Sequence, residues 1–326
     1  MQRILNVVNF VRPKKPTVNA VHLRGVIAAR AGPRGIAFGA VKEQLEAAFK
    51  VGSSMTTRVT QTPLAALSRR LKKRNQRRTS NKQTNKQGAP EAVALVINSP
   101  GGSPVQSNLI TQLIDSLATK TKIPVLSFAE DVAASGGYWL LCAGQEVYCD
   151  PSSIVGSIGV VNGSFGLHAL MERIGVERRL LTAGESKARL DPFLPQRADD
   201  VAKMEKSLSA IHDVFKEHVR STRKGKIKGH EEKIFNGDFF IGREGLELGL
   251  VDKIGSVHQV AKEKFGPDVV IRDISPRPRF PFLPPWIGGG GAGGGVSMSA
   301  CLMDEAVTAV EARVEERLWR ARVGLE

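Results

Sequence analysis

The stretch that decides the fold is EDVAASGGYWLLCAG, residues 130–144. In it, Ser135, Gly136 and Gly137 lead directly into the bulky apolar run YWLLC. The apolar segment IPVLSF (123–128) before it predicts a buried strand, and the run after it predicts a buried helix over about 136–145. Glycines at the start of a helix lower its stability, so their position directly after a serine needs an explanation.

The rest of the chain alternates between strands and helices in the same way. The periodicity of apolar residues predicts strands at 17–29, 93–97, 123–128, 146–150, 153–161 and 177–182, and helices at 39–50, 105–119, 136–145, 165–173 and 197–222. Such alternation is typical of an α/β protein with a largely parallel sheet.

The composition is that of a globular protein. The chain has 326 residues, of which 41% are hydrophobic and 24% charged, enough for one large domain or two small ones. No apolar run approaches the length of about 18 to 20 residues that a transmembrane helix needs. The three cysteines have neither metal-site nor disulfide spacing, and no nucleotide-binding motif is present, so we expect no metal and no cofactor.

The strongly basic character of the chain comes mainly from one segment. The net charge is +15, and residues 51–90 contribute ten Lys or Arg and no Asp or Glu, which leaves +5 for the rest. Within this segment RRLKKRNQRR (69–78) resembles a nuclear-localisation or nucleic-acid-binding patch. We favour a disordered surface insertion, and do not expect nucleic acid as a partner.

The remaining sequence divides the chain into segments. Residues 1–16 are basic and free of acidic residues, and either an organelle-targeting leader or a flexible basic tail fits them. A folded domain is expected over 17–275, interrupted by 51–90. A Pro- and Gly-rich linker follows at 276–296, and 297–326 reads as an amphipathic helix, with apolar residues every four positions.

Ser135 is the first candidate for chemistry. It lies where a strand meets a helix, and free N–H groups at a helix start stabilise negative charge. A helix N-cap is the simpler interpretation of this serine. A second glycine turn, INSPGGS (97–103), also follows a strand. An N–H of Gly101 or Gly102, together with that of Gly136, would give an oxyanion two donors, each contributing about 3 to 4 kcal/mol in the transition state.

A nucleophilic serine needs a base, and Lys187 is the candidate. None of the six histidines lies in a motif that suggests a Ser-His-Asp arrangement. Lys187 lies in LLTAGESKARLDPF (180–193), in a turn of small residues. Lysine acts as a base only where burial or nearby positive charge favours its neutral form. A solvated surface lysine is the alternative interpretation.

Three segments together carry a family resemblance. LVINSPGGS (95–103), EDVAASGGYWLLCAG and TAGESKARLDPF (182–193) resemble the signal peptide peptidase A family, also called protease IV, in its short, single-module SohB-like branch. PSSIVGSIGVV (151–161) and IFNGDFFIGREGLELGLVDKIGS (234–256) match as well. The resemblance covers about residues 17–50 and 91–275.

The resemblance implies a fold and an activity. The fold would be α/β, a ClpP/crotonase-like spiral of strand-strand-helix units around a mostly parallel sheet. The activity would be that of a serine endopeptidase that cuts signal-peptide-like or apolar, misfolded polypeptides through a Ser-Lys dyad and an acyl-enzyme. The implied roles are Ser135 as nucleophile, Lys187 as general base, Gly136 with the Gly101-Gly102 turn as oxyanion hole, and Ser157 as the residue that orients the lysine.

The resemblance also implies partners. Family members form rings or domes, and in single-module members the serine and lysine of one site come from adjacent subunits, so we expect a homo-oligomer with active sites at its interfaces. Bacterial relatives usually carry an N-terminal membrane anchor that is not evident here, which leaves membrane contact and compartment open.

Other classes of protein stay open at this stage. A crotonase-type enzyme acting on a CoA thioester would share the fold and the oxyanion hole. A basic binding protein would act through residues 51–90, and a catalytically inactive peptidase relative would act as an interaction protein.

Overall fold

The structure is a computed structural model that describes residues 15–30, 35–50 and 88–274. The leader or tail expected over 1–16, the basic segment 51–90, the linker 276–296 and the helix 297–326 lie wholly or almost wholly outside the described residues.

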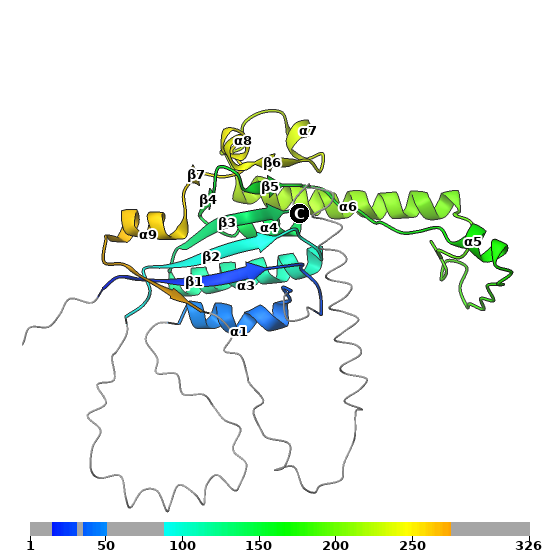
Figure 1. Ribbon diagram of the computed structural model, residues 1–326, viewed down its shortest axis with the longest axis horizontal. Coiled ribbons are helices and arrows are strands. Elements are labelled where there is room, and N and C mark those ends of the chain that lie inside the picture. Colours follow the sequence, from blue (N-terminus) through cyan, green and yellow to red (C-terminus); the bar gives the residue numbers. More distant parts are fainter. Residues whose placement is uncertain (1–14, 31–34, 51–87, 275–326) are drawn as a thin grey trace, which may run out of the picture.

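The described residues form one mixed sheet flanked by helices (Figure 1). The strands are β1 (Thr17–Arg24), β2 (Ala92–Ser99), β3 (Val125–Ala134), β4 (Glu146–Cys149), β5 (Ile154–Gly156), β6 (Phe239–Ile241), β7 (Lys253–Ile254) and β8 (Val270–Asp273). The helices are α1 (Phe38–Ala48), α3 (Pro104–Thr121), α4 (Gly136–Leu141), α5 (His168–Arg173), α6 (Ala198–Thr222), α7 (Glu231–Ile234), α8 (Gly242–Glu247) and α9 (Val257–Phe265).

The sheet has the spiral topology expected from the resemblance. Its strand order is β6-β5-β3-β2-β1-β8, and every pairing is parallel except β5 with β6. The long strand β3 pairs first with β4, from Leu126 to Ala129, and then with β5, from Val132 to Ala134. The partner of β3 therefore changes from β4 to β5 between Ala129 and Val132. The α/β prediction of a ClpP/crotonase-like fold is confirmed.

Both faces of the sheet are buried, as a parallel sheet requires. Strand β2, AVALVINS, is apolar at successive positions because its side chains point alternately to two cores. One core lies between the sheet and helices α1, α3 and α4, and includes Leu45, Leu95 and Ile110. The other lies beneath α9, and includes Val96 and Val260.

Some of the predicted elements differ from the observed ones. Strand 123–128 continues to Ala134, so it ends directly before Ser135, and the helix predicted over 136–145 ends at Leu141. The predicted strand 177–182 is wrong, because these residues form no strand in the structure. The segment is ERRLLT, whose only apolar residues are two adjacent leucines, and no strand among the described residues pairs with it to complete its backbone hydrogen bonds.

Residues 159–197 leave the sheet as a projecting arm that carries α5. Helix α6 runs outward from the sheet, and α5 lies near its far end (Figure 1). The arm is held by its own contacts, such as the Arg178–Asp191 ion pair, and by Arg189, which pairs with Asp200 at the start of α6. We use the name arm for residues 159–197 below.

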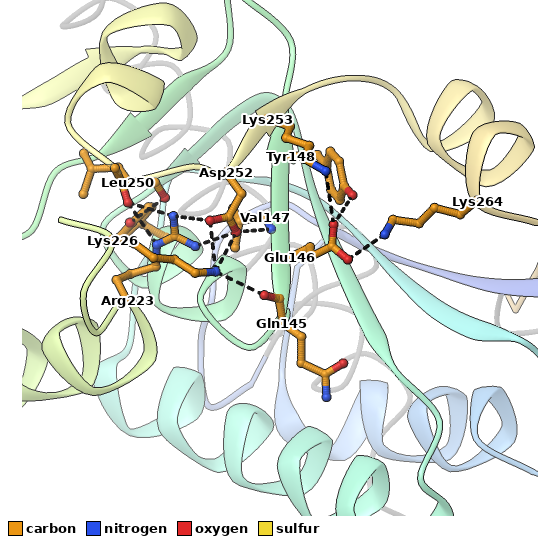
Figure 2. Close-up of polar contacts among 12 residues, drawn as sticks. Gln145, Glu146, Val147, Tyr148, Arg223, Lys226, Leu250, Asp252, Lys253 and Lys264 are labelled. Carbon is orange, nitrogen blue, oxygen red and sulfur yellow. Dashed lines mark hydrogen bonds and ion pairs between the residues drawn. The ribbon is translucent and has the colours of Figure 1, made fainter. Parts of the chain in front are cut away.

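A buried arginine fixes the other end of α6. Arg223, which is 1% exposed, donates two hydrogen bonds to the carbonyl of Gly249 and two to the carboxylate of Asp252 (Figure 2). Burial opposes ionisation of Asp252, but hydrogen bonds from Arg223, Lys226 and the Val147 N–H outweigh it and hold its pKa below the ordinary value. The cluster therefore joins α6, β4 and the loop before β7.

We predict that Arg223→Ala lowers the free energy of unfolding by about 3 to 5 kcal/mol, because the buried Gly249 carbonyl and the partly buried Asp252 lose their main partner. Arg179→Ala is the matched control, since its ion pair with Glu177 is exposed and contributes at most about 1 kcal/mol. Urea unfolding of both variants measures the difference. Equal losses would contradict the assignment of Arg223 as the anchor of α6.

Candidate active site

Three parallel strands end at the same edge of the sheet. Ser99 at the end of β2 pairs with Ala133, and Ala134 at the end of β3 pairs with Gly156 at the end of β5. The turn after β2, Ser135 after β3 and Ser157 after β5 therefore lie side by side. The edge formed by the carboxyl ends of parallel strands is where such folds usually place a ligand.

The backbone of Ser135 adopts a conformation that is rare for a residue with a side chain. Its φ is 51° and its ψ is −121°. Its N–H donates to the Gly156 carbonyl at 2.8 Å, and its carbonyl accepts from the Trp139 N–H. Its side chain makes no capping hydrogen bond, so the helix N-cap interpretation does not describe it. Such conformations cost about 1 to 3 kcal/mol and cluster at active sites. The sharp strand-to-helix turn resembles the elbow on which hydrolases present a nucleophilic serine.

The glycine turn after β2 packs against this elbow, backbone to backbone. A Cβ on Gly101 would lie 2.7 Å from Gly136 N and 2.8 Å from Ser135 Cβ. A Cβ on Gly136 would lie 3.3 Å from Gly102 N, and one on Gly137 would lie 2.4 Å from Ser99 O. Only glycine permits this approach, which explains why the helix after Ser135 begins with two of them.

Within the part of the chain that the structure describes, two N–H groups at this contact have no hydrogen-bond partner. The N–H of Gly101 donates to Ser99 Oγ at 3.2 Å. For Gly102 N and Gly136 N, no acceptor is found among residues 15–30, 35–50 and 88–274. Of the two turn glycines considered from the sequence, Gly102 is therefore the one with an available donor. Gly136 is also the first residue of α4, where the helix dipole favours negative charge.

Two histidines of helix α6 that the sequence analysis did not single out contact the segments after Ser135 and after Ser157. The Trp139 ring stacks on Phe215 and on His218, with ring centroids 4.9 and 4.8 Å apart. His218 Nε2 donates to the Trp139 carbonyl at 3.1 Å, and His212 Nε2 to the Ile158 carbonyl at 2.9 Å. Burial lowers the pKa of His218 and outweighs the opposite effect of its hydrogen bond, so the ring is neutral at neutral pH.

Ser157 follows the end of β5, next to the strand end from which Ser135 follows. It follows Gly156 directly, has a φ of 51°, and its N–H donates to the Asp238 carbonyl at 2.8 Å. Two serines at neighbouring strand ends thus share an uncommon backbone conformation. Strain of this kind persists only where surrounding contacts impose it.

Lys187 is not brought to Ser135 within one chain. It lies in the arm, in a turn where its N–H donates to the Gly184 carbonyl, and its side chain is exposed. The arm segment on either side of α5 lies away from α4, toward the far end of α6 (Figure 1). The same arm exposes many apolar side chains, among them Leu181 at 99% and Phe165 at 82%.

Neither a metal site nor a membrane-spanning helix is found among the described residues. Among them, no three or more His, Cys, Asp or Glu side chains come together in a way that could hold a metal ion. The same residues contain no helix with the length and hydropathy to cross a bilayer. Burial raises the pKa of the Cys142 thiol to about 11, so this cysteine, which lies behind the elbow, is protonated and unreactive at neutral pH.

Residues 118–265, which include the elbow, Ser157, the arm and α6, match the sequence profile of peptidase family S49. This match bears out the resemblance to the SPPA/SohB-like proteases of family S49. The chloroplastic serine protease SPPA of Arabidopsis thaliana is 32% identical over 53% of this chain and 26% of its own length. The putative protease SohB of Buchnera aphidicola is 31% identical over 51% of this chain and 46% of its own length.

Another relative carries a different name. The Na(+)/H(+) antiporter NhaA of Brucella abortus is 46% identical over 57% of this chain and 25% of its own length. That name describes a protein four times as long as its similar part, whereas the similar part of this chain matches a peptidase family, so the name is not carried over. The chain spans about a quarter to a half of the length of these three curated relatives.

We predict that Gly137→Ala destabilises the protein by about 1 to 3 kcal/mol, because the added Cβ would overlap the Ser99 carbonyl 2.4 Å away. The matched control is Gly39→Ala in the first turn of α1, where a Cβ meets nothing within 4 Å. That variant should be neutral or slightly more stable than the wild type. Thermal unfolding compares them, and equal stability of the two variants would contradict the close approach.

We predict that Ser135→Gly is about 1 kcal/mol more stable than Ser135→Ala, because glycine accepts a positive φ without strain. Both variants lack the hydroxyl. The greater freedom of glycine in the unfolded chain opposes the gain, so the difference is a lower limit on the backbone strain that glycine relieves. Urea unfolding measures it. An alanine variant more stable than the glycine variant by about 0.5 to 1 kcal/mol, the difference expected at an unstrained position, would mean that the elbow is unstrained.

Proposed function

We propose that this chain is a serine endopeptidase in which Ser135 is the nucleophile. The observation that supports this most is the strained turn of Ser135 beside the unpaired N–H groups of Gly136 and Gly102. In the proposed reaction Ser135 Oγ attacks a peptide carbonyl carbon while its proton passes to a base. The two N–H groups would stabilise the oxyanion. The C–N bond then breaks, the amine leaves with the proton, and water hydrolyses the acyl-enzyme.

We propose Lys187 as this base, supplied by an adjacent copy of the chain. The arm that carries Lys187 leads away from its own Ser135, and it exposes apolar side chains including Leu181, Phe165 and Ile174. Exposed apolar patches of this kind are typical of interaction surfaces. Packing of the arm on a neighbour would remove water from the lysine, which is the condition for it to act as a base. In this arrangement Ser157 would orient the incoming lysine.

The proposed substrates are signal-peptide-like or apolar, misfolded polypeptides. This part rests on the family resemblance and on the apolar side chains that the arm would bring near the elbow. A crotonase-type thioester enzyme would need the oxyanion hole, but it would not need a serine held in a strained turn or a lysine on the arm. The geometry of Ser135 therefore favours the peptidase over that alternative.

A mixing experiment tests the nucleophile, the base and their origin in two copies. Ser135→Ala and Lys187→Ala proteins should each fail to cleave an apolar fluorogenic peptide. When they are unfolded together in equal amounts and refolded, about a quarter of the sites should combine an intact serine with an intact lysine, and a similar share of wild-type activity should return. The controls are each variant refolded alone and the wild type refolded in the same way.

Each part of the proposal can fail separately. Undiminished cleavage by Ser135→Ala would exclude the nucleophile, and undiminished cleavage by Lys187→Ala would exclude the base. Two inactive variants that stay inactive after mixing, although size-exclusion chromatography shows mixed assemblies, would place serine and lysine in the same copy. Wild-type labelling with a fluorophosphonate, mapped by mass spectrometry, should identify Ser135.

A further inference from the structure

The turn that presents the Gly102 N–H is held by one buried side chain, that of Ser99. Ser99 ends β2 and is 0% exposed. Its hydroxyl donates to the Gly25 carbonyl at 2.7 Å and accepts the Gly101 N–H at 3.2 Å. Both bonds are made away from water, where an unpaired polar group is costly.

Gly25, the acceptor of the Ser99 hydroxyl, belongs to a segment that runs beside the turn. Ile27 N–H donates to the Gly101 carbonyl at 2.8 Å, and Ser103 N–H donates to the Ile27 carbonyl at 2.7 Å. These two backbone bonds fix the turn at Gly101 and at Ser103, and the Ser99 hydroxyl ties the start of the turn to Gly25. Of these contacts, only that of Ser99 can be removed by changing a side chain.

We propose that Ser99 is a positioning residue of the oxyanion hole, an inference that rests on the proposed peptidase function. By engaging the N–H of Gly101, its hydroxyl decides which of the two adjacent glycine N–H groups is available to substrate. The neighbouring Gly102 N–H stays unpaired and lies next to Gly136. Ser99 itself would touch neither the substrate nor the reacting atoms, because it is buried beneath the turn.

The contact with α4 makes this position sensitive. A Cβ on Gly137 would lie 2.4 Å from Ser99 O and 3.2 Å from Ser99 Cβ, so Ser99 is packed between the oxyanion turn and the helix that follows the nucleophile. Loss of its hydroxyl would free the Gly101 N–H and allow the peptide planes of the turn to rotate. The geometry of the donors toward the oxyanion would then vary from molecule to molecule.

The test compares Ser99→Ala with Ser127→Ala in the full chain. Ser127 lies on β3 and is also 0% exposed, but its hydroxyl has no hydrogen-bond partner among the described residues. Both variants lose one buried hydroxyl, and only the first loses hydrogen bonds. We measure kcat and KM on an apolar peptide, the rate of fluorophosphonate labelling of Ser135, and hydrogen exchange of the peptide that contains residues 99–103.

For Ser99→Ala we expect kcat and the labelling rate to fall about ten- to a hundredfold, less than for outright loss of an oxyanion donor, with KM within about twofold of the wild type. Hydrogen exchange in the turn should become faster. Ser127→Ala should match the wild type in all these measurements. A transition-state effect of this kind distinguishes positioning from general loss of structure, which would lower the folded fraction and leave kcat per folded molecule unchanged.

Several results would overturn the inference. They are an unchanged kcat for Ser99→Ala, a rise in KM alone, or failure of this variant to fold while Ser127→Ala folds, which would give Ser99 a purely structural role. Wild-type protein that neither cleaves peptide nor reacts at Ser135 would instead overturn the proposed function, and the inference with it. An active wild type with an unaffected Ser99→Ala variant would overturn only the inference.

Discussion

The structure depends on a contact between two backbone turns that leaves no space for a Cβ atom. The turn after β2 and the start of α4 approach so closely that a methyl group on Gly101 would lie 2.7 Å from Gly136 N, and one on Gly137 would lie 2.4 Å from Ser99 O. A glycine in a helix costs about 1 kcal/mol relative to alanine, whereas an overlap inside a packed core costs about 1 to 3 kcal/mol. The glycines therefore lower the intrinsic stability of the helix, but they allow the two turns to approach this closely.

Several features of the site follow from this contact. Because α4 lies against the end of β2, its whole length is buried, and Tyr138 can reach the Leu250 carbonyl on the far side. That anchor holds the helix at the position where β3 has ended, so the connecting residue, Ser135, has to make the turn at a positive φ. The strain at the serine and the unpaired N–H groups are thus consequences of one packing requirement.

The sequence predicted those parts of the site that have a local signature. Ser135 was expected between a strand and a helix because apolar runs flank it, and the glycine turns were expected because each follows a strand. The α/β fold followed from the same alternation. Which turn glycine keeps a free N–H was not predictable, because the answer depends on the hydroxyl of Ser99 beneath the turn.

Long-range contacts account for what the sequence did not reveal. In the sequence, Arg223, His212 and His218 look like ordinary polar residues of an amphipathic helix. They matter because they donate hydrogen bonds to carbonyl groups and a carboxylate that lie far away in the sequence. The predicted strand at 177–182 failed for a related reason. A strand requires a partner for its backbone hydrogen bonds, and this segment of the arm has none among the described residues.

Helix α6 links the elbow, the Arg223 cluster and the arm. Its C-terminal half is fixed to the elbow by Phe215 and the two histidines and to β4 by Arg223, while its N-terminal half extends away from the sheet and carries the arm. A rigid helix held at one end determines where its other end lies. The arm, with Lys187 and its exposed apolar side chains, is therefore held at a defined distance from its own Ser135. Burial of those apolar side chains would stabilise an assembly, and the same burial would exclude water from the lysine. In the proposed enzyme, assembly and activation of the base would be a single event.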